Sequence, residues 1–231
     1  ENKVSYIRKI LAAGYDKDVW ANLAESNPTL VTKLSYARIQ SKKQEVVNEL
    51  EERLRSGNYS ETSGTDSWQK WIYQHNWLFG VNYQEPIQKS KINLNGIMPD
   101  YLFPTLDGFI DILEIKLPDD EVILEDGSHN GAWKWTQESN TAIGQVVNYL
   151  CEIDRLRYEI EKNIKLIYGK ELCLLKPRAN ILIGNSSTWD QPKKEALRKM
   201  NHAMHGIEIV TYHELYERGL QSIALVPENL V

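Results

Sequence analysis

The residues best suited to chemistry are two carboxylates and a lysine at a short spacing. Asp100 follows Pro99, and after thirteen intervening residues the chain continues Glu114-Ile115-Lys116. Side chains alternate along a strand, so Glu114 and Lys116 are expected on one face and Ile115 on the other. The apolar neighbours of this segment predict a strand buried on both faces. A glutamate and a lysine are costly there unless they are paired or bind a metal.

A tight turn brings Asp100 to the same place. Leu106-Asp107-Gly108 fits a three-residue hairpin loop with glycine at the left-handed position, so Thr105 should pair with Phe109. Counting back five residues on each strand sets Asp100 opposite Glu114, with Cβ atoms about 5 Å apart. A slip of one residue would move Asp100 to the other face, so the argument depends on this register.

Two carboxylates at that separation repel each other unless a cation lies between them. Asp100, Glu114 and the backbone carbonyl of Ile115 form a ligand set for Mg²⁺ or Mn²⁺ that leaves positions for water. Such a metal lowers the pKa of a bound water and neutralises charge on a phosphodiester. Lys116 is suited to hold the scissile phosphate and to orient or help deprotonate that water. These parts predict hydrolysis of phosphodiester bonds.

The same residues resemble the PD-(D/E)XK nuclease signature. Gln145 and Tyr149 lie four apart, on one face of a predicted helix, and resemble the Gln-Tyr element that follows the lysine in many of these nucleases. More narrowly, the chain is similar to the Shedu family of antiphage nucleases over about residues 40–220. The phrases that carry this resemblance are WQKWIYQHNWLFG, MPDYLF, DGFIDILEIKLP and AIGQVVNY.

The resemblance implies a metal-dependent DNA nuclease of bacterial antiphage defence. It implies that the nuclease domain is the C-terminal part of a longer protein, which assembles into homo-oligomers such as a dimer or tetramer. The catalytic residues would be Asp100, Glu114, Lys116 and Gln145, and the metal would be Mg²⁺ or Mn²⁺. A catalytically silent nuclease-like module that binds DNA or mediates assembly is the alternative. The presence of Lys116 beside both carboxylates favours the enzyme.

One position departs from the family pattern. Many relatives carry a glutamate three residues before the tryptophan that matches Trp68, on the first helix of the nuclease core. Here that position is Thr65, with Asp66 beside it and Gln69 further on. A carboxylate from this helix is therefore doubtful, and the number of metals stays open.

Composition narrows the class of protein without naming the partner. The 231 residues include 42% hydrophobic and 26% charged residues, which fits a globular chain. No apolar run approaches the ~20 residues of a membrane span. Net charge is −5, yet residues 151–200 hold 11 basic against 7 acidic residues, so one basic face for nucleic acid is compatible with an acidic total.

The ends and the cysteines set further expectations. The start, Glu1-Asn2-Lys3, lacks a methionine and a signal pattern, which suggests a piece of a longer chain. Cys151 and Cys173 have no spacing typical of a zinc site or a disulfide framework, so a reducing, cytoplasmic setting is expected.

Three parts are predicted along the chain: a helical annex over residues 1–57, a linker over 58–65 and the nuclease domain over 66–231. Gly57 is a natural end for the annex. The fold class is α/β (α+β), with the order helix, three-strand meander, helix, strand, helix, strand from residue 66. Within this order, Ser41 and Asp66 are predicted helix caps, and Asn95-Gly96 is a predicted hairpin turn. Residues 119–140 are predicted as a long loop, with a helix from about Ser139.

Several residues have two interpretations. The Val47, Leu50, Leu54 stripe predicts a covered helix face, either on the chain's own core or in a subunit contact that the family resemblance favours. Trp133 and Trp135 alternate as on an extended segment, where they would stack on bases or pack on the core. The basic run at residues 193–199 suits phosphate contact or a solvated helix face. Asp111 is expected on the face opposite Glu114, in a structural role.

Overall fold

The computed structural model describes residues 9, 16–88, 99–129 and 131–224. The chain divides into two compact units: Glu1–Asn48 with Leu220–Val231, and Glu49–Gly219. All the predicted site residues belong to the second unit. None of the helices in the described part combines the length and the apolar character of a bilayer-spanning segment.

The first unit consists of helices. Helix α2 covers Asp16–Ser26, and α3 covers Pro28–Ser56, whose last turns belong to the second unit. Pro28 occupies the first helical position of α3, and the Asn27 side chain accepts a hydrogen bond from the Leu30 amide at 3.0 Å. Gly57, with φ of +66°, follows the end of the helix as expected.

The predicted cap at Ser41 is wrong, because α3 runs without interruption from Pro28. The residues around Ser41 are ordinary helix formers, so the helix that Asn27 starts continues through them. Val47 and Leu50 are fully buried within the single chain, so the apolar stripe of α3 is covered at these two positions. The predicted division at residues 58–65 stays a prediction.

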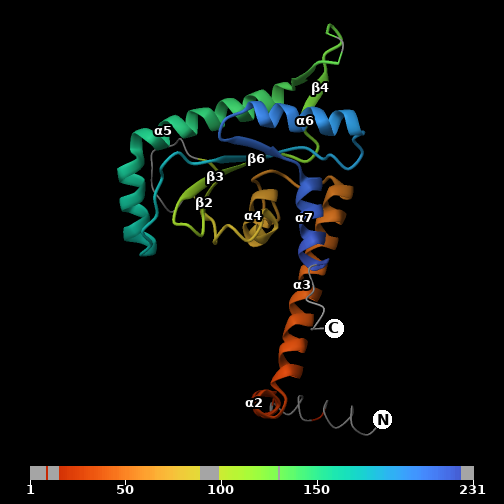
Figure 1. Ribbon diagram of the computed structural model, residues 1–231, viewed down its shortest axis with the longest axis vertical. Coiled ribbons are helices and arrows are strands. Elements are labelled where there is room, and N and C mark those ends of the chain that lie inside the picture. Colours follow the sequence, from red (N-terminus) through yellow and green to blue (C-terminus); the bar gives the residue numbers. More distant parts are fainter. Residues whose placement is uncertain (1–8, 10–15, 89–98, 130, 225–231) are drawn as a thin grey trace. The chain divides into compact units, whose positions relative to one another are not determined.

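A five-stranded mixed sheet organises the second unit (Figure 1). Its order is β1-β2-β3-β6-β7, in which β1, β2 and β3 are antiparallel and β3, β6 and β7 are parallel. The strands span Ile87–Gln88, Tyr101–Pro104, Ile110–Ile115, Ala179–Leu182 and Ile207–Val210. The helices are α4 (Trp68–Gln74), α5 (Gln137–Tyr168), α6 (Gln191–Ala203) and α7 (Tyr212–Ala224), and a 3₁₀ helix covers Asn76–Phe79.

This order confirms the predicted α+β class, and the predicted elements occur in the expected sequence, with β4, β5 and α7 in addition. The predicted Asn95-Gly96 turn lies outside the described residues. Helix α5 begins at Gln137, two residues before the expected start, because the Thr136 hydroxyl accepts from the Ser139 amide at 3.1 Å and caps it. Helix α7 was not predicted.

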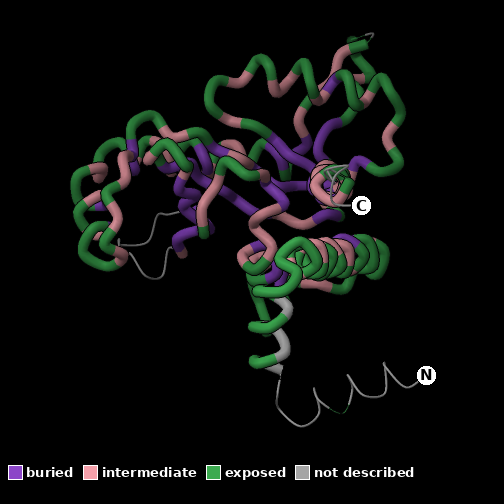
Figure 2. Tube along the Cα trace, turned by 60° about the horizontal axis from the view of Figure 1, so that its bottom comes forward, coloured by how far each residue is buried: buried purple, intermediate pink, exposed green. Residues whose placement is uncertain are grey.

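Helices cover both faces of the sheet. Helices α5 and α6 pack on the face that carries Ile110, Ile112 and Ile181, which belong to one continuous apolar core (Figure 1). Strands β2 and β3 are buried along their whole length, and the centre of the sheet is purple in Figure 2. On the other face Phe79 meets Phe103, with ring centroids 5.3 Å apart. Every residue of β3 is therefore buried, as its apolar pattern predicts.

Two local predictions need correction. Helix α4 is capped by Ser67, whose hydroxyl accepts from the Lys70 amide, and not by Asp66, whose carboxylate instead binds Arg53. Asp66 forms a charge-assisted ion pair with the buried Arg53 guanidinium, which is stronger than a helix cap, and Ser67 provides the cap in its place. The segment 119–140 is not only a loop, because β4 (Ile123–Glu125) and β5 (Trp133–Trp135) form an antiparallel hairpin within it.

Candidate functional site

The β2–β3 hairpin has the predicted register. Tyr101 pairs with Leu113 and Pro104 with Ile110, so Asp100 lies directly opposite Glu114 when the pairing is extended by one residue. Gly108, with φ of +87°, occupies the left-handed position of the turn, and the Thr105 amide donates to the Phe109 carbonyl at 2.8 Å. The turn therefore fixes which residues of the two strands share a face.

Asp100 and Glu114 are both buried, at 6% and 3% relative exposure. The Asp100 Oδ2 atom accepts a hydrogen bond from the Ile115 amide at 3.0 Å. This bond anchors the carboxylate at the end of β3, where the two strands separate. Burial of two carboxylates at one place is costly unless cations or hydrogen bonds compensate for it.

Lys116 is the cation of this group. Its Nζ lies 2.9 Å from Glu114 Oε1, and its backbone carbonyl accepts from the Tyr212 hydroxyl at 2.6 Å. Burial disfavours the charged ammonium, but the nearby carboxylates, Glu114 first, outweigh it and raise the pKa of Lys116. The side chain therefore carries a positive charge beside the two acids.

The backbone carbonyl of Ile115 also lies at this end of β3. Successive residues of a strand point their N–H and C=O groups to alternate sides, and the Lys116 amide donates to Leu182 of β6 at 2.8 Å. The carbonyl of Ile115 therefore points toward β2, as its amide does. The register sets Pro99 opposite it, and a proline has no N–H to donate. Extended to that position, the register therefore offers no backbone donor from Pro99 to the Ile115 carbonyl.

Helix α5 contributes Gln145 and Tyr149. Burial first, and then the charges of Glu114, Asp100 and Glu61, together raise the pKa of Tyr149 to about 12, so its phenol lies near the acids. Gln145 lies one turn earlier on the same helix face. Its Oε1 atom is buried and has no hydrogen-bond partner among the described residues. An amide oxygen of this kind is normally satisfied, so a bound group or water is expected there.

Glu61 also belongs to this group, and sequence reasoning missed it. Its carboxylate lies 3.9 Å from Lys116 Nζ, although residue 61 falls in the predicted linker. Thr65, the position at which relatives carry a glutamate, is exposed. No pattern in a short polar segment reveals that it folds over a strand, so nothing in the sequence marked Glu61.

The donor set fits a hard divalent cation. Mg²⁺ takes oxygen ligands, commonly from one or two carboxylates, and keeps several waters. Asp100, Glu114 and the Ile115 carbonyl supply oxygens of this kind, and α5 carries a further buried amide oxygen at Gln145. The described residues contain no group of three or more His, Cys, Asp or Glu side chains arranged to hold a metal.

The other residues with two interpretations mostly have structural roles. Asp111 accepts from the Arg178 amide at 2.9 Å and from the Tyr83 hydroxyl at 3.2 Å, on the face opposite Glu114, as predicted. Trp133 and Trp135 pack against the apolar core. In the basic run of α6, Lys193 pairs with Glu121 at 3.1 Å.

These features define a mixed α/β protein with an acidic, lysine-containing site at the end of its central hairpin. A family model described as Shedu protein SduA, C-terminal, matches residues 62–216. The chain therefore belongs to the Shedu family, and this membership associates it with antiphage defence. No curated protein matches the sequence.

Proposed function

We propose that this protein hydrolyses phosphodiester bonds of DNA, with Mg²⁺ or Mn²⁺, as its part in antiphage defence. The observation that carries the proposal is the meeting of Asp100, Glu114 and Lys116 at the end of one buried hairpin. Glu114 and Lys116 lie two residues apart on one face of the strand and pair at 2.9 Å, so the ammonium lies beside the acids. The resemblance to PD-(D/E)XK nucleases supports the same assignment.

Each residue has a role that its position allows. Asp100, Glu114 and the Ile115 carbonyl would hold the cation, which supplies charge neutralisation and an activated water when it is bound. Lys116 faces the scissile phosphate and stabilises the charge that develops on it. Gln145 orients a water or a phosphate oxygen through its buried amide. The core beneath β3 keeps these side chains in fixed positions.

The experiment is a cleavage assay on circular and linear DNA with Mg²⁺, Mn²⁺ or EDTA. Asp100→Asn and Glu114→Gln each remove one charge with little change of shape, and cleavage should fall by ~10²-fold or more. Glu208→Gln, which changes an exposed carboxylate of the same sheet, is the matched control and should cut normally. Full activity in EDTA or in Asp100→Asn would reject the proposal.

One observation favours the silent module as a second candidate. Asp100 accepts a hydrogen bond from the Ile115 amide and Glu114 accepts one from the Lys116 ammonium, so both acids have structural roles. A silent module would bind DNA and cut none of it with any divalent cation. A wild type that binds DNA without cutting it, together with a Glu114→Gln variant that binds DNA equally well, would identify that case.

DNA and further copies of the chain are the proposed partners. A homo-oligomer with two-fold symmetry would present paired sites to the two strands of a duplex. The burial of Val47 and Leu50 leaves these residues without apolar surface for a subunit contact, so other surfaces would form it. Light scattering on the full chain measures the particle mass, and a monomer at all concentrations would contradict this part.

A further inference from the structure

The segment between α3 and α4 is hydrogen-bonded to the start of α4, and Glu61 within it contacts Lys116 of the site. The Trp68 amide donates to the Ser60 carbonyl at 3.0 Å, and the Gln69 amide donates to the Glu61 carbonyl at 3.1 Å. These two bonds hold the start of the loop 58–66 against the first turn of α4. They fix the position of the Glu61 backbone, and its side chain extends from there to Lys116.

Arg53 fastens both ends of this loop. Its guanidinium lies 4.1 Å from the centroid of the Tyr59 ring at one end and binds the Asp66 carboxylate at the other. Arg53 is 3% exposed and also pairs with Glu49 at 2.9 Å, so the arginine itself is fixed in α3. A planar guanidinium suits this task, since it stacks on an aromatic ring while its edge binds carboxylates.

Lys116 therefore lies between two carboxylates, at 2.9 Å from Glu114 and 3.9 Å from Glu61. Glu114 is also a ligand of the proposed cation, and a carboxylate that binds a divalent ion attracts a lysine less. Glu61 comes from a different element and is held independently of Glu114. Its carboxylate therefore remains next to the ammonium when Glu114 binds a cation.

We propose that Glu61 is a positioning residue that fixes the ammonium of Lys116, and that Arg53 places it there by closing the loop 58–66. The proposal deepens the proposed nuclease function and rests on it for its catalytic consequence. The contact itself does not depend on that function, because all of its parts lie within one unit of the apo chain.

The first test measures the reactivity of Lys116 without DNA or metal. The protein is treated with limiting acetic anhydride, and the acetylation of each lysine is followed by mass spectrometry. Glu61→Gln should raise the acetylation rate at Lys116 by a factor of about 2–5, the range expected for loss of one ion-pair partner. Asp66→Asn, which opens the Arg53 contact from a 60% exposed side chain, should raise it less.

Lys193 is the internal control. Its side chain is 19% exposed against 17% for Lys116, and it pairs with Glu121. Glu121→Gln should raise acetylation at Lys193 alone, and Glu61→Gln at Lys116 alone. Equal Lys116 acetylation in the wild type and in Glu61→Gln would overturn the proposal. A rise at both lysines would show a general loosening and would overturn it as well.

The second test separates this inference from the proposed function. In cleavage, Glu61→Gln should lower kcat by ~10-fold with KM unchanged, because Lys116 is misplaced while DNA contacts remain. If the wild type cuts no DNA, the nuclease proposal fails, and the acetylation pattern still decides the Glu61 contact. If the wild type cuts and Glu61→Gln cuts equally well, the inference alone fails.

Discussion

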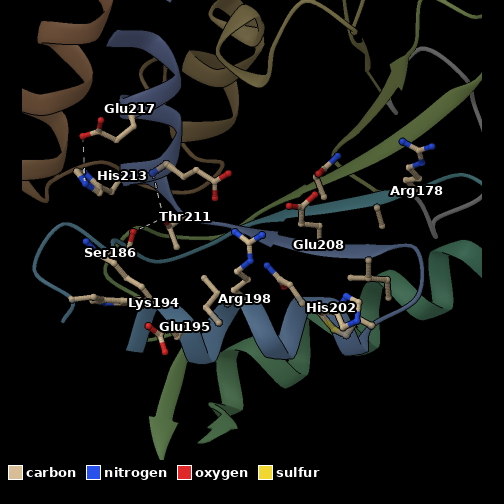
Figure 3. A pocket seen from close by; sticks show the side chains of 18 of the residues that line it. Arg178, Ser186, Lys194, Glu195, Arg198, His202, Glu208, Thr211, His213 and Glu217 are labelled. Atoms are coloured by element: carbon tan, nitrogen blue, oxygen red, sulfur yellow. Dashed lines mark hydrogen bonds and ion pairs between the residues drawn. The ribbon is translucent and has the colours of Figure 1, made fainter. Parts of the chain in front are cut away.

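Two regions of the second unit collect charged side chains, and they differ in burial. The candidate site at the β2–β3 hairpin buries Asp100 and Glu114. A groove of about 1210 Å³ lies beside β7, between α6 and α7, and contains none of the predicted site residues (Figure 3). Its cations Arg178, Lys194 and Arg198 are exposed.

The groove also carries both signs of charge. Glu195, Glu208 and Glu214 line it together with those cations. In Figure 3 Arg198 extends from α6 toward the strand, and the marked contacts are local pairs such as Ser186 with Thr211. Exposed charges cost little, so this mixture needs no ligand to explain it. Buried charges are expensive, so the smaller cluster at the hairpin is the more informative of the two.

The strongest test of this difference compares Lys116→Ala with Arg198→Ala. Lys116→Ala should lower cleavage by ~10²-fold or more and leave DNA affinity nearly unchanged, because one cation adds little to binding but much to a developing charge. Arg198→Ala should leave kcat unchanged. If the groove contacts DNA, Arg198→Ala should also reduce the salt dependence of DNA binding by the amount expected for about one lost phosphate contact. Both are measured by titration and single-turnover cleavage.

Proportional losses of binding and cleavage in Lys116→Ala would make Lys116 a residue that binds DNA and takes no part in the reaction. A large kcat effect in Arg198→Ala would show that the groove, and not the hairpin, holds the reaction.

Two glycines give a second test, on stability. Gly184 and Gly206 have the same φ of +71°, but only Gly184 is crowded. A Cβ on Gly184 would contact Val122 and lie 2.8 Å from the Asp120 carbonyl oxygen, whereas one on Gly206, in the groove, meets nothing within 4 Å. Gly206→Ala should cost about 1–2 kcal/mol from backbone strain, and Gly184→Ala about 2–4 kcal/mol because the clash adds to it.

The free energies of unfolding come from urea titrations with matched slopes. Equal losses in the two variants would mean that the turn after β6 adjusts easily, and that the backbone beside the site is no more rigid than the groove.

The third test concerns Asn201, a groove residue whose side chain binds the backbone of the edge strand β7. Its side chain accepts from the Ile209 amide at 3.1 Å and donates to the Ile209 carbonyl at 2.8 Å. Asn201→Ala should destabilise the protein by about 1–3 kcal/mol, because both backbone groups lose their partner. Asn201→Asp keeps the acceptor and should cost less. An unchanged unfolding midpoint in Asn201→Ala would show that water replaces the amide.

Local patterns predicted the hairpin well, because its register depends on a few adjacent residues. Gly108 sets the turn, and alternation along six residues then places Asp100 opposite Glu114. Helix α7 was missed although a signal was present. Thr211 and Glu214 have the spacing of a capping box, and the Thr211 hydroxyl accepts from the Glu214 amide at 3.3 Å. The cap at Ser67 was assigned one residue early because Asp66 is an equally good cap in isolation.

The sequence by itself determined the pairing of the acids and the lysine, since strand alternation and turn geometry act over neighbouring residues. Only the tertiary structure decided what surrounds them. Glu61 reaches Lys116 because Arg53 of α3, eight residues earlier in the chain, closes the loop 58–66. Tyr212 reaches the Lys116 carbonyl from 96 residues away. Contacts of this kind depend on how whole elements pack, and no local spacing encodes them.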